Sequence, residues 1–181
     1  MYGEYISVGS MFPAFTLNGV NGDNEIKKFE SYDIKGWTVF YFYPKDFTFI
    51  CPTEIAEMDR LVDEGVNVFG FSGDNEFCKL NWKKANGQIR EIRHSLLADT
   101  GLNLSHELDI VHQEEGVCLR ATFIVDPKFV IQHASVNALD TGRSVDEVIW
   151  TVKALQAGGL TGCQWNPGDD FVAWVVSMTD L

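Results

Sequence analysis

The chain lacks the long apolar runs and the surplus of basic residues that mark several large classes of protein. No stretch of its 181 residues approaches the roughly 18 consecutive apolar residues that a membrane span needs. Fourteen Lys and Arg residues stand against 26 Asp and Glu residues, which gives a formal net charge of −12. Such a charge repels nucleic acids and anionic membranes, because both are bound through basic side chains that neutralise phosphates. We therefore expect neither nucleic acid nor a membrane as a partner.

The beginning of the chain also lacks the features of an export signal. Residues 1–15 carry Glu4 but no Lys or Arg, and they contain no long apolar segment. A secretory signal combines a basic start with an apolar stretch. We therefore expect a cytoplasmic protein. With 45% apolar and 22% charged residues, the chain has the composition of an ordinary globular domain.

Cysteine is scarce, and its spacing excludes two common uses. There are four cysteines without a Cys-x-x-Cys pair, and no Cys and His residues stand at zinc-ligand spacing, so no metal site is expected. A structural disulfide framework is not expected in a cytosolic chain. Each cysteine is by default a small buried hydrophobe, so a reactive role has to be argued from its surroundings. The cysteines are Cys51, Cys78, Cys118 and Cys163. The four histidines, which are assigned no catalytic role, are His94, His106, His112 and His133.

Short apolar runs bounded by turn residues predict four strands. They are residues 38–43, 66–72, 121–125 and 130–136. The first two runs are too continuous for a one-sided sheet, so we expect central strands covered on both faces. The Asp126-Pro127-Lys128 sequence between the last two predicts a turn and an antiparallel return.

The first predicted helix follows the strand at residues 38–43. Pro52 suits a first helical turn, and Glu54 suits the positive end of the helix dipole. Gly65 is a suitable C-cap. Apolar residues recur between these ends at helical spacing: Ile55, Met58, Leu61 and Val62.

Two further helices complete the expected fold. Residues 74–85 form one, with Phe77 and Leu80 on one face and the short basic run 82–84 on a solvated face. The other follows the capping box at 144–147 and ends at Gly158-Gly159. The order of elements indicates α/β architecture with a thioredoxin-like fold, a central mixed sheet flanked by helices. We expect this domain to span residues 1–159, and the C-terminal tail 160–181 to pack its apolar stretch 171–176 on a neighbour.

The segment from Pro44 to Glu54 carries the candidate chemistry, because it lies where a central strand ends and a helix begins. Ligands bind at that edge in open α/β sheets. Cys51, in the first turn of the helix, meets the positive end of the dipole and unsatisfied N–H groups, which stabilise a thiolate. Thr48 places a hydroxyl three residues before the sulfur, and Pro44 adds a wall without an N–H donor.

This segment resembles the shared active-site pattern of the peroxiredoxins, Pro-x-x-x-(Thr/Ser)-x-x-Cys, present as Pro44, Thr48 and Cys51. The chain is most similar to the group that contains bacterial alkyl hydroperoxide reductase C and the typical two-cysteine enzymes. Residues 120–127 (RATFIVDP) and 142–147 (GRSVDE) support this assignment. The resemblance extends from about residue 9 to residue 168, nearly the whole chain.

The resemblance implies a thiol-dependent peroxidase that reduces hydrogen peroxide and organic hydroperoxides without metal, haem or flavin. Cys51 would be the peroxidatic cysteine, which attacks the peroxide and becomes a sulfenic acid. Arg120 would pair with its thiolate and orient the peroxide, a task suited to a permanently charged guanidinium. Thr48 and N–H groups near Cys51 would stabilise the transition state. Glu54 would hold Arg120 in place, and Arg143 would add positive charge.

Cys163 is the candidate for the second thiol that resolves the sulfenic acid. In the family this tail cysteine comes from the other protomer of a homodimer, and the dimers can assemble into a ring such as a decamer. The usual resolving cysteine stands four residues before the tail tryptophan, which here is Thr161 relative to Trp165. Cys163 stands two residues before Trp165, as in members with an extra tail cysteine. The alternative is a free tail thiol, with Cys51 reduced directly by an external thiol.

The resemblance leaves the reductant open among thioredoxin, a flavoprotein disulfide reductase and a dedicated small dithiol partner. Family members that excess peroxide inactivates carry a Gly-Gly-Leu-Gly insertion and a C-terminal Tyr-Phe. Neither string occurs here, and the corresponding stretch 86–90 reads NGQIR. We therefore expect resistance to sulfinic acid formation.

Two other classes of function are weighed against the peroxidase. A redox-sensing or chaperone-type binding protein would use the same fold and thiol without turning over with reductant. A disulfide oxidoreductase of the thioredoxin kind would use a Cys-x-x-Cys pair, which is absent, and insulin reduction would reveal it. Core or surface positions are expected for Cys78 and Cys118, and packing or interface positions for Trp82, Trp165 and Trp174.

Overall fold

The structure is a computed structural model, and it describes residues 6–172 of the chain. The chain divides into two compact units, residues 1–145 and residues 146–181. The two units meet at residue 145. The domain boundary expected after residue 159 concerns which part of the chain folds independently, and it stays a prediction. Within residues 6–172, no helix is long and apolar enough to cross a membrane.

The first unit is built on a mixed sheet. Its strands are β1 Thr16–Val20, β2 Ile26–Glu30, β3 Thr38–Phe42, β4 Asn67–Ser72, β5 Ser95–Ala98, β8 Arg120–Val125 and β9 Ile131–Asn137. They lie in the order β2-β1-β5-β4-β3-β8-β9. The three central strands β3, β4 and β5 are parallel, and β8 and β9 continue the sheet in antiparallel fashion. On the other side β1 pairs antiparallel with β5, and β2 with β1.

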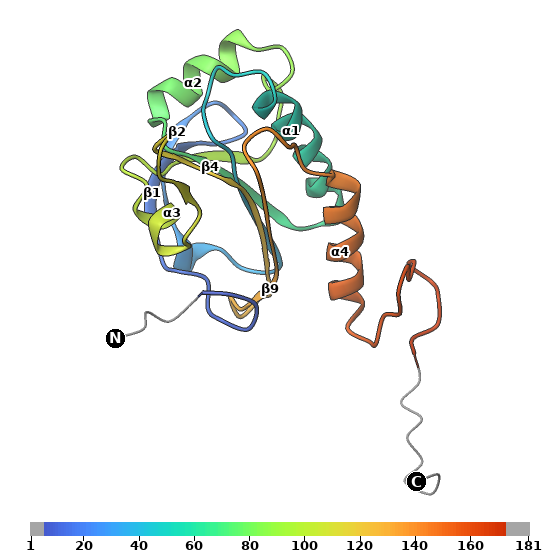
Figure 1. The fold of residues 1–181 in the computed structure, drawn as a ribbon. Helices are drawn as coiled ribbons and strands as arrows, with labels where there is room; N and C mark the ends of the chain where they lie inside the picture. Colours follow the sequence, from blue (N-terminus) through green and yellow to red (C-terminus); the bar gives the residue numbers. More distant parts are fainter. Residues whose placement is uncertain (1–5, 173–181) are drawn as a thin grey trace, which may run out of the picture. The chain divides into compact units, whose positions relative to one another are not determined.

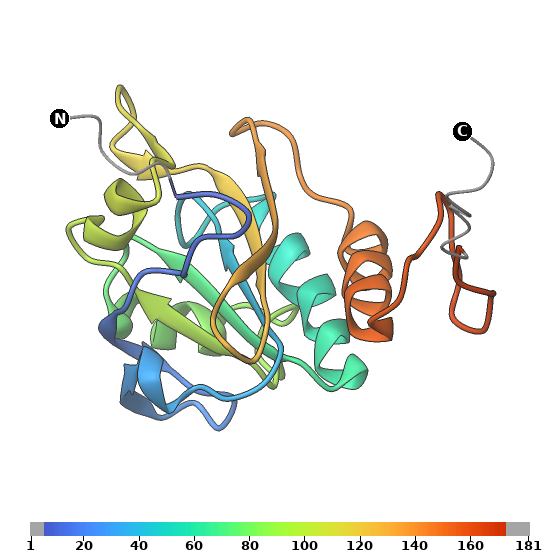
Figure 2. The ribbon, with the colours of Figure 1, turned by 90° about the horizontal axis from the view of Figure 1, so that it is seen from below.

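Helices flank this sheet, which confirms the expected fold class. The remaining elements are the short helix η1 Ser31–Asp33, α1 Cys51–Met58, η2 Asp59–Glu64, α2 Glu76–Ala85, α3 Asn103–Glu107, β6 Val111–His112, β7 Val117–Cys118 and α4 Val145–Ala157. The helices α1 and α3 lie on opposite faces of the strands (Figure 1; Figure 2). A small hairpin of β6 and β7 stands apart from the main sheet.

Strand β3 lies inside the sheet, between β4 and β8, and each of its five residues is buried. Phe40 and Phe42 belong to an apolar cluster that also contains Phe71 and, from the N-terminal segment, Phe12. Because successive side chains of a strand point to opposite faces, Tyr41 points to the other side. The expectation that the two central runs are covered on both faces is confirmed for β3.

The helix expected after the first strand is present, but its second half has a different geometry. α1 ends at Met58 and continues directly into the 3₁₀ helix η2. Gly65 closes η2 in the left-handed region at φ 71°, which confirms the expected cap and suits glycine because it has no Cβ. Leu61 is buried as the spacing indicated.

The predicted faces of α2 were wrong. Its buried residues are Lys79, Trp82 and Lys83, whereas Phe77 is 61% exposed and Leu80 is half-buried. The interpretation of the basic run as a solvated face therefore holds only for its last lysine. A hydrophobic pattern places apolar residues inside, so it misses a helix whose inner face is held by buried hydrogen bonds.

Both buried lysines of α2 have polar partners inside the protein. Lys79 Nζ donates to Tyr43 Oη at 3.1 Å, and Lys83 Nζ donates to the Asn21 carbonyl at 3.0 Å. Their apolar stems can then pack while the ammonium groups stay hydrogen-bonded. Burial lowers the pKa of Lys83 from its ordinary value, which is the direction expected for a desolvated cation.

The second unit consists of α4 and the segment that follows it. The Trp150 indole donates to the Trp165 carbonyl, and the Trp165 ring stacks on Phe171 at 6.0 Å between centroids. Val172 N donates to the Leu160 carbonyl at 2.8 Å, so the segment folds back on itself. The expected packing of the apolar stretch on a neighbour stays a prediction; its residues 173–176, Trp174 among them, lie outside the described part of the chain.

Candidate active site

Cys51 is the first residue of α1 and is only 1% exposed. It follows a loop, residues 43–50, that leaves the carboxyl end of β3. Pro52 lies in the first turn, and Ile50 makes no side-chain cap hydrogen bond. An uncapped helix start leaves backbone N–H groups for a ligand with electron-rich oxygen atoms.

A cavity of about 280 Å³ lies over Cys51. Its walls come from the loop before α1, from the turn of the β6–β7 hairpin, from the start of β8 and from the segment after β9. The structure thus brings together the residues expected at one site, Pro44, Thr48, Cys51 and Arg120, although they are up to 76 positions apart. The other lining residues are Lys45, Phe49, Ile50, Glu115, Val117, Leu139 and Asp140.

Arg120 connects the sulfur to a buried carboxylate. Its Nη1 lies 3.5 Å from Cys51 Sγ and donates to Glu54 Oε2 at 2.6 Å. Its Nε donates to the Leu139 carbonyl at 2.6 Å, which fixes the plane of the guanidinium. Burial by itself lowers the pKa of Arg120, but the hydrogen bond to Cys51 and the charge of Glu54 raise it above its ordinary value. The guanidinium is therefore a permanent positive charge beside the sulfur.

Glu54 lies between two buried guanidinium groups. Its Oε1 accepts from both the backbone N–H and Nε of Arg143 at 3.0 Å, while Oε2 accepts from Arg120. Side-chain exposure is 3% for the carboxylate and 5% for each arginine. Two guanidinium groups around one carboxylate leave a net positive charge beside the sulfur of Cys51.

Arg143 does more than add charge, because atoms of β3 and β8 hold it. Its Nη1 donates to the Ala121 carbonyl at 2.9 Å and to Thr122 Oγ1 at 3.0 Å, and its Nη2 donates to the Phe42 carbonyl. The guanidinium carbon lies 5.3 Å from the centre of the Tyr41 ring. Arg143 therefore ties Glu54 to β3 and β8.

Thr48 is oriented by the loop itself. Its hydroxyl donates to the Lys45 carbonyl at 2.9 Å, so its oxygen can still accept a hydrogen bond in the cavity. Phe47 has φ 56°, an uncommon value for a residue with a side chain, and its ring lies 6.0 Å from that of Trp82. The loop thus makes a sharp corner just before the hydroxyl.

A buried polar cluster anchors this loop from below. Ser72 Oγ donates to Asp46 Oδ1 at 3.0 Å, the Asp46 backbone N–H donates to Asp74 Oδ2 at 2.8 Å, and Lys79 Nζ lies 3.4 Å from Asp46. Burial raises the pKa of Asp46, and the Lys79 ammonium offsets part of that rise. The sequence analysis did not find this cluster, because Asp46, Ser72, Asp74 and Lys79 come from separate elements and no short-range spacing connects them.

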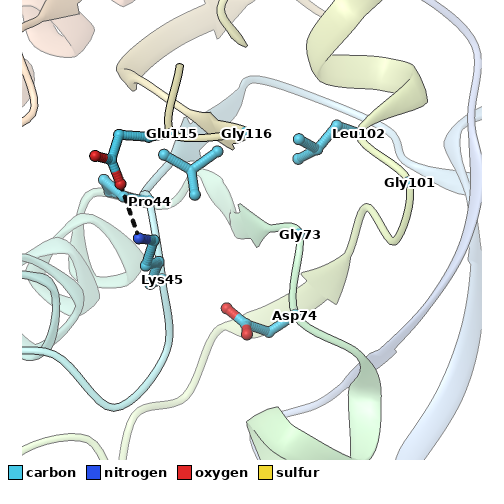
Figure 3. Close-up of a pocket in the computed structure, with 9 residues that line it drawn as sticks. Pro44, Lys45, Gly73, Asp74, Gly101, Leu102, Glu115 and Gly116 are labelled. Atoms are coloured by element: carbon cyan, nitrogen blue, oxygen red, sulfur yellow. Dashed lines mark hydrogen bonds and ion pairs between the residues drawn. The ribbon is translucent and has the colours of Figure 1, made fainter. Parts of the chain in front are cut away.

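A second cavity of about 460 Å³ adjoins the first. The two share Pro44, Lys45 and Glu115 as walls, and Lys45 Nζ pairs with Glu115 Oε2 at 3.2 Å between them. Figure 3 shows this ion pair on one side of the cavity, with Asp74 and Leu102 on the others. The cavity lies where the parallel strands β3, β4 and β5 end, the ligand-binding edge of such sheets.

The other three cysteines differ sharply in environment. Cys118 is fully buried, donates to the Tyr43 carbonyl, and burial raises its pKa to about 12. Cys78 is half-buried, and burial and the Asp46 charge raise its pKa to about 11. Both are poor nucleophiles at neutral pH, in line with the core or surface roles expected of them. Cys163 is exposed and lies in the second unit.

The fold and the cavity are those of cysteine-based redox proteins with a thioredoxin-like sheet. Residues 8–134 match the family model described as AhpC/TSA family. Alkyl hydroperoxide reductase C of Mycolicibacterium smegmatis is 36% identical over 180 residues, covering 91% of this chain and 92% of the relative. Peroxiredoxin-1 of Gallus gallus is 34% identical over 177 residues, covering 91% and 89%.

Solved structures give the same result. A reduced 2-Cys peroxiredoxin of Plasmodium vivax superimposes with a TM-score of 0.84 at 34% identity, covering 92% of this chain and 91% of that one. AhpC of Mycobacterium tuberculosis has a TM-score of 0.77 at 35% identity, covering 84% and 99%. The chain belongs to the AhpC/TSA family, among the peroxiredoxins.

Proposed function

We propose that the protein is a thiol-dependent peroxidase that reduces hydrogen peroxide and small organic hydroperoxides at Cys51. The observation that carries this proposal is the pairing of a buried sulfur at a helix start with the Arg120 guanidinium at 3.5 Å. The helix dipole and this charge both favour the thiolate, which is the nucleophilic form. The apolar walls of the cavity, which include Phe49, Val117 and Leu139, suit a small alkyl group.

The first chemical step is nucleophilic attack on the peroxide. The Cys51 thiolate forms an S–O bond with the terminal oxygen, the O–O bond breaks, and the leaving oxygen takes a proton to become an alcohol or water. Cys51 is oxidised to a sulfenic acid and the peroxide is reduced. Arg120 and the N–H groups at the start of α1 stabilise the charge that develops on the oxygens. Thr48 accepts a hydrogen bond from the peroxide, and Pro44 excludes water.

The second step restores the thiol state through a disulfide. The thiol of Cys163 from the other protomer attacks the Cys51 sulfenic acid, the S–S bond forms, and the oxygen leaves as water. The exposure of Cys163 supports this role, because a resolving thiol has to be reached by another protomer. A dithiol or flavoprotein reductant then cleaves the disulfide. We infer a cytoplasmic homodimer, with a ring of dimers as the larger assembly.

One experiment tests both steps. One equivalent of hydrogen peroxide is added to reduced wild type and to Cys163→Ser without reductant, and intact masses are measured. We expect a disulfide-linked dimer in wild type and one added oxygen atom on Cys51 in Cys163→Ser, where no thiol resolves it.

The matched control is Cys78→Ser, which removes a thiol of raised pKa outside the cavity and is expected to behave as wild type. An unchanged disulfide in Cys163→Ser would show that another thiol resolves Cys51. An unmodified Cys51 in all forms would exclude the peroxidase function itself.

Resistance to excess peroxide is a separate prediction. Without the insertion and terminal motif of the sensitive members, the disulfide is expected to form before a second peroxide reaches the sulfenic acid. Mass spectrometry after turnover with excess peroxide and reductant should then show little sulfinic acid on Cys51. Inactivation after a low number of turnovers would contradict this expectation.

A further inference from the structure

A second network of buried polar side chains, formed by Tyr41, His94 and Asp59, has no part in the chemistry proposed above. It contains Tyr41, which is 0% exposed, and His94, which is 4% exposed. Tyr41 Oη lies 2.7 Å from His94 Nε2, and His94 Nδ1 lies 2.8 Å from Asp59 Oδ1. A buried polar group lowers stability unless it is hydrogen-bonded, so a buried network of this kind is expected to have a structural or functional role.

The direction of these hydrogen bonds follows from the charges. Burial by itself raises the pKa of Asp59, but hydrogen bonds from His94 and Arg93 hold it well below its usual range, so the carboxylate is ionised and only accepts. His94 Nδ1 therefore carries a hydrogen. Burial lowers the pKa of His94, so the ring is neutral and Nε2 accepts. The Tyr41 hydroxyl then donates to Nε2, which fixes the position of its ring.

The Tyr41 ring is the surface on which Arg143 rests. The guanidinium carbon lies 5.3 Å from the ring centre, within the range of a cation–π contact. The neighbouring strand leaves room for the ring, because residue 70, which pairs with Tyr41, is a glycine. A Cβ at Gly70 would lie 2.5 Å from Tyr41 Cζ and Oη. A glycine in the middle of a buried strand is otherwise unfavourable, so this position is shaped for the ring.

The contacts of Tyr41 also extend to both ends of helix α1. Cys51 and Glu54 lie at its start, and Asp59 lies just after its last residue. Arg143 joins Tyr41 to Glu54, and His94 joins Tyr41 to Asp59. Tyr41 on the central strand is therefore held to both ends of the helix that carries the sulfur.

We propose that Tyr41, tethered by His94 and Asp59, is a positioning residue that sets the place of Arg143 and, through Glu54, of the Arg120 guanidinium beside Cys51. The proposal rests on the proposed function only for its peroxide readout. Hydrogen bonds to β3 and β8 hold the edges of the Arg143 guanidinium, and the Tyr41 ring supports its face, so a ring that moves would change the angle at which Arg143 meets Glu54. A displaced Arg143 would let Glu54 and Arg120 shift, and a shift of about 1 Å at a reacting group lowers rates strongly.

The test uses variants that break or keep the tether. Tyr41→Phe keeps the ring and removes the hydroxyl, and His94→Leu removes the acceptor. For each we expect the rate constant of Cys51 with hydrogen peroxide to fall about three- to tenfold. We also expect the pH profile of Cys51 alkylation by iodoacetamide to move to higher pH, because Arg120 no longer favours the thiolate as strongly. The double variant should be no slower than the single ones, since both break one connection.

Two controls separate positioning from stability. His94→Gln can accept from Tyr41 and donate to Asp59 through its amide, so it should recover most of the rate and of the alkylation profile. Ile131→Val creates a small cavity in the apolar cluster that contains Phe40 and Phe42, on the face of the sheet opposite Tyr41, and should lower stability without changing either readout.

The outcomes are distinct. If Tyr41→Phe and His94→Leu lower only the unfolding temperature, or if His94→Gln is as impaired as His94→Leu, the positioning role is wrong. If wild type does not react with peroxide, the proposed function fails, yet the alkylation profiles still decide whether Tyr41 acts on the environment of Cys51.

Discussion

Replacement of Cys51 by Ser is expected to abolish peroxide turnover, with a loss of more than about a thousandfold. A serine hydroxyl is a poor nucleophile at neutral pH, and the side chain that contacts this position, Arg120, is a hydrogen-bond donor that cannot act as a base. The measurement is steady-state consumption of hydrogen peroxide with a dithiol reductant. The fold should persist, because serine is close to cysteine in size.

The control for this prediction is Cys78→Ser, which changes the same atom on α2 and should keep wild-type turnover. Substantial turnover in Cys51→Ser would contradict the site assignment. The same assay separates a peroxidase from a redox sensor, because a sensor reacts once with peroxide and does not cycle with reductant. Wild type that is oxidised at Cys51 but fails to turn over with any dithiol would favour the sensor.

Replacement of Glu54 by Gln is expected to lower the free energy of unfolding by about 3–5 kcal/mol. The carboxylate is 3% exposed and separates two guanidinium groups that are each 5% exposed. Without its charge, both cations stay buried with only a neutral acceptor between them. Chemical denaturation followed by circular dichroism measures this change.

The same substitution should also slow the reaction of Cys51 with peroxide, because Arg120 loses the partner that holds it near the sulfur. The matched control is Glu57→Gln on the same helix, where an exposed carboxylate pairs with Arg60 at 3.0 Å. Exposed pairs of this kind contribute about 0–1 kcal/mol, so stability and rate should stay close to wild type. Equal effects of the two substitutions would mean that the buried cluster has no special role.

The site residues that could be assigned from the sequence are those whose role follows from their spacing to near neighbours in the chain. Pro44, Thr48 and Cys51 stand at fixed spacing within one strand-to-helix segment, and the structure brings all three to one cavity. The strands β3 and β4 were predicted correctly, because continuous apolar runs between turn residues have few other interpretations. The strands β1, β2 and β5 were missed, since their residues lack such a run and gain their pairing from the sheet.

The sequence misjudged residues whose partners are distant in the chain. Lys79 and Lys83 look exposed in a linear pattern, yet each is buried with a hydrogen-bond partner from another element. His94 had no ligand-spaced neighbour and was assigned no role, but the fold brings it to Tyr41 and Asp59. The glycine at position 70 was a signal of close approach, although nothing in the sequence names the ring that approaches.

The sequence by itself determined the class of fold and the reactive segment, because apolar periodicity, helix caps and short-range spacing act between neighbouring residues. The family followed from the resemblance carried by the motifs at 44–51, 120–127 and 142–147. The tertiary structure alone decided how Arg120, Glu54 and Arg143 meet behind Cys51, and which polar side chains lie inside. These contacts join residues that are from 66 to 89 positions apart. Their energies depend on burial and distance, and both are set only when the sheet has assembled.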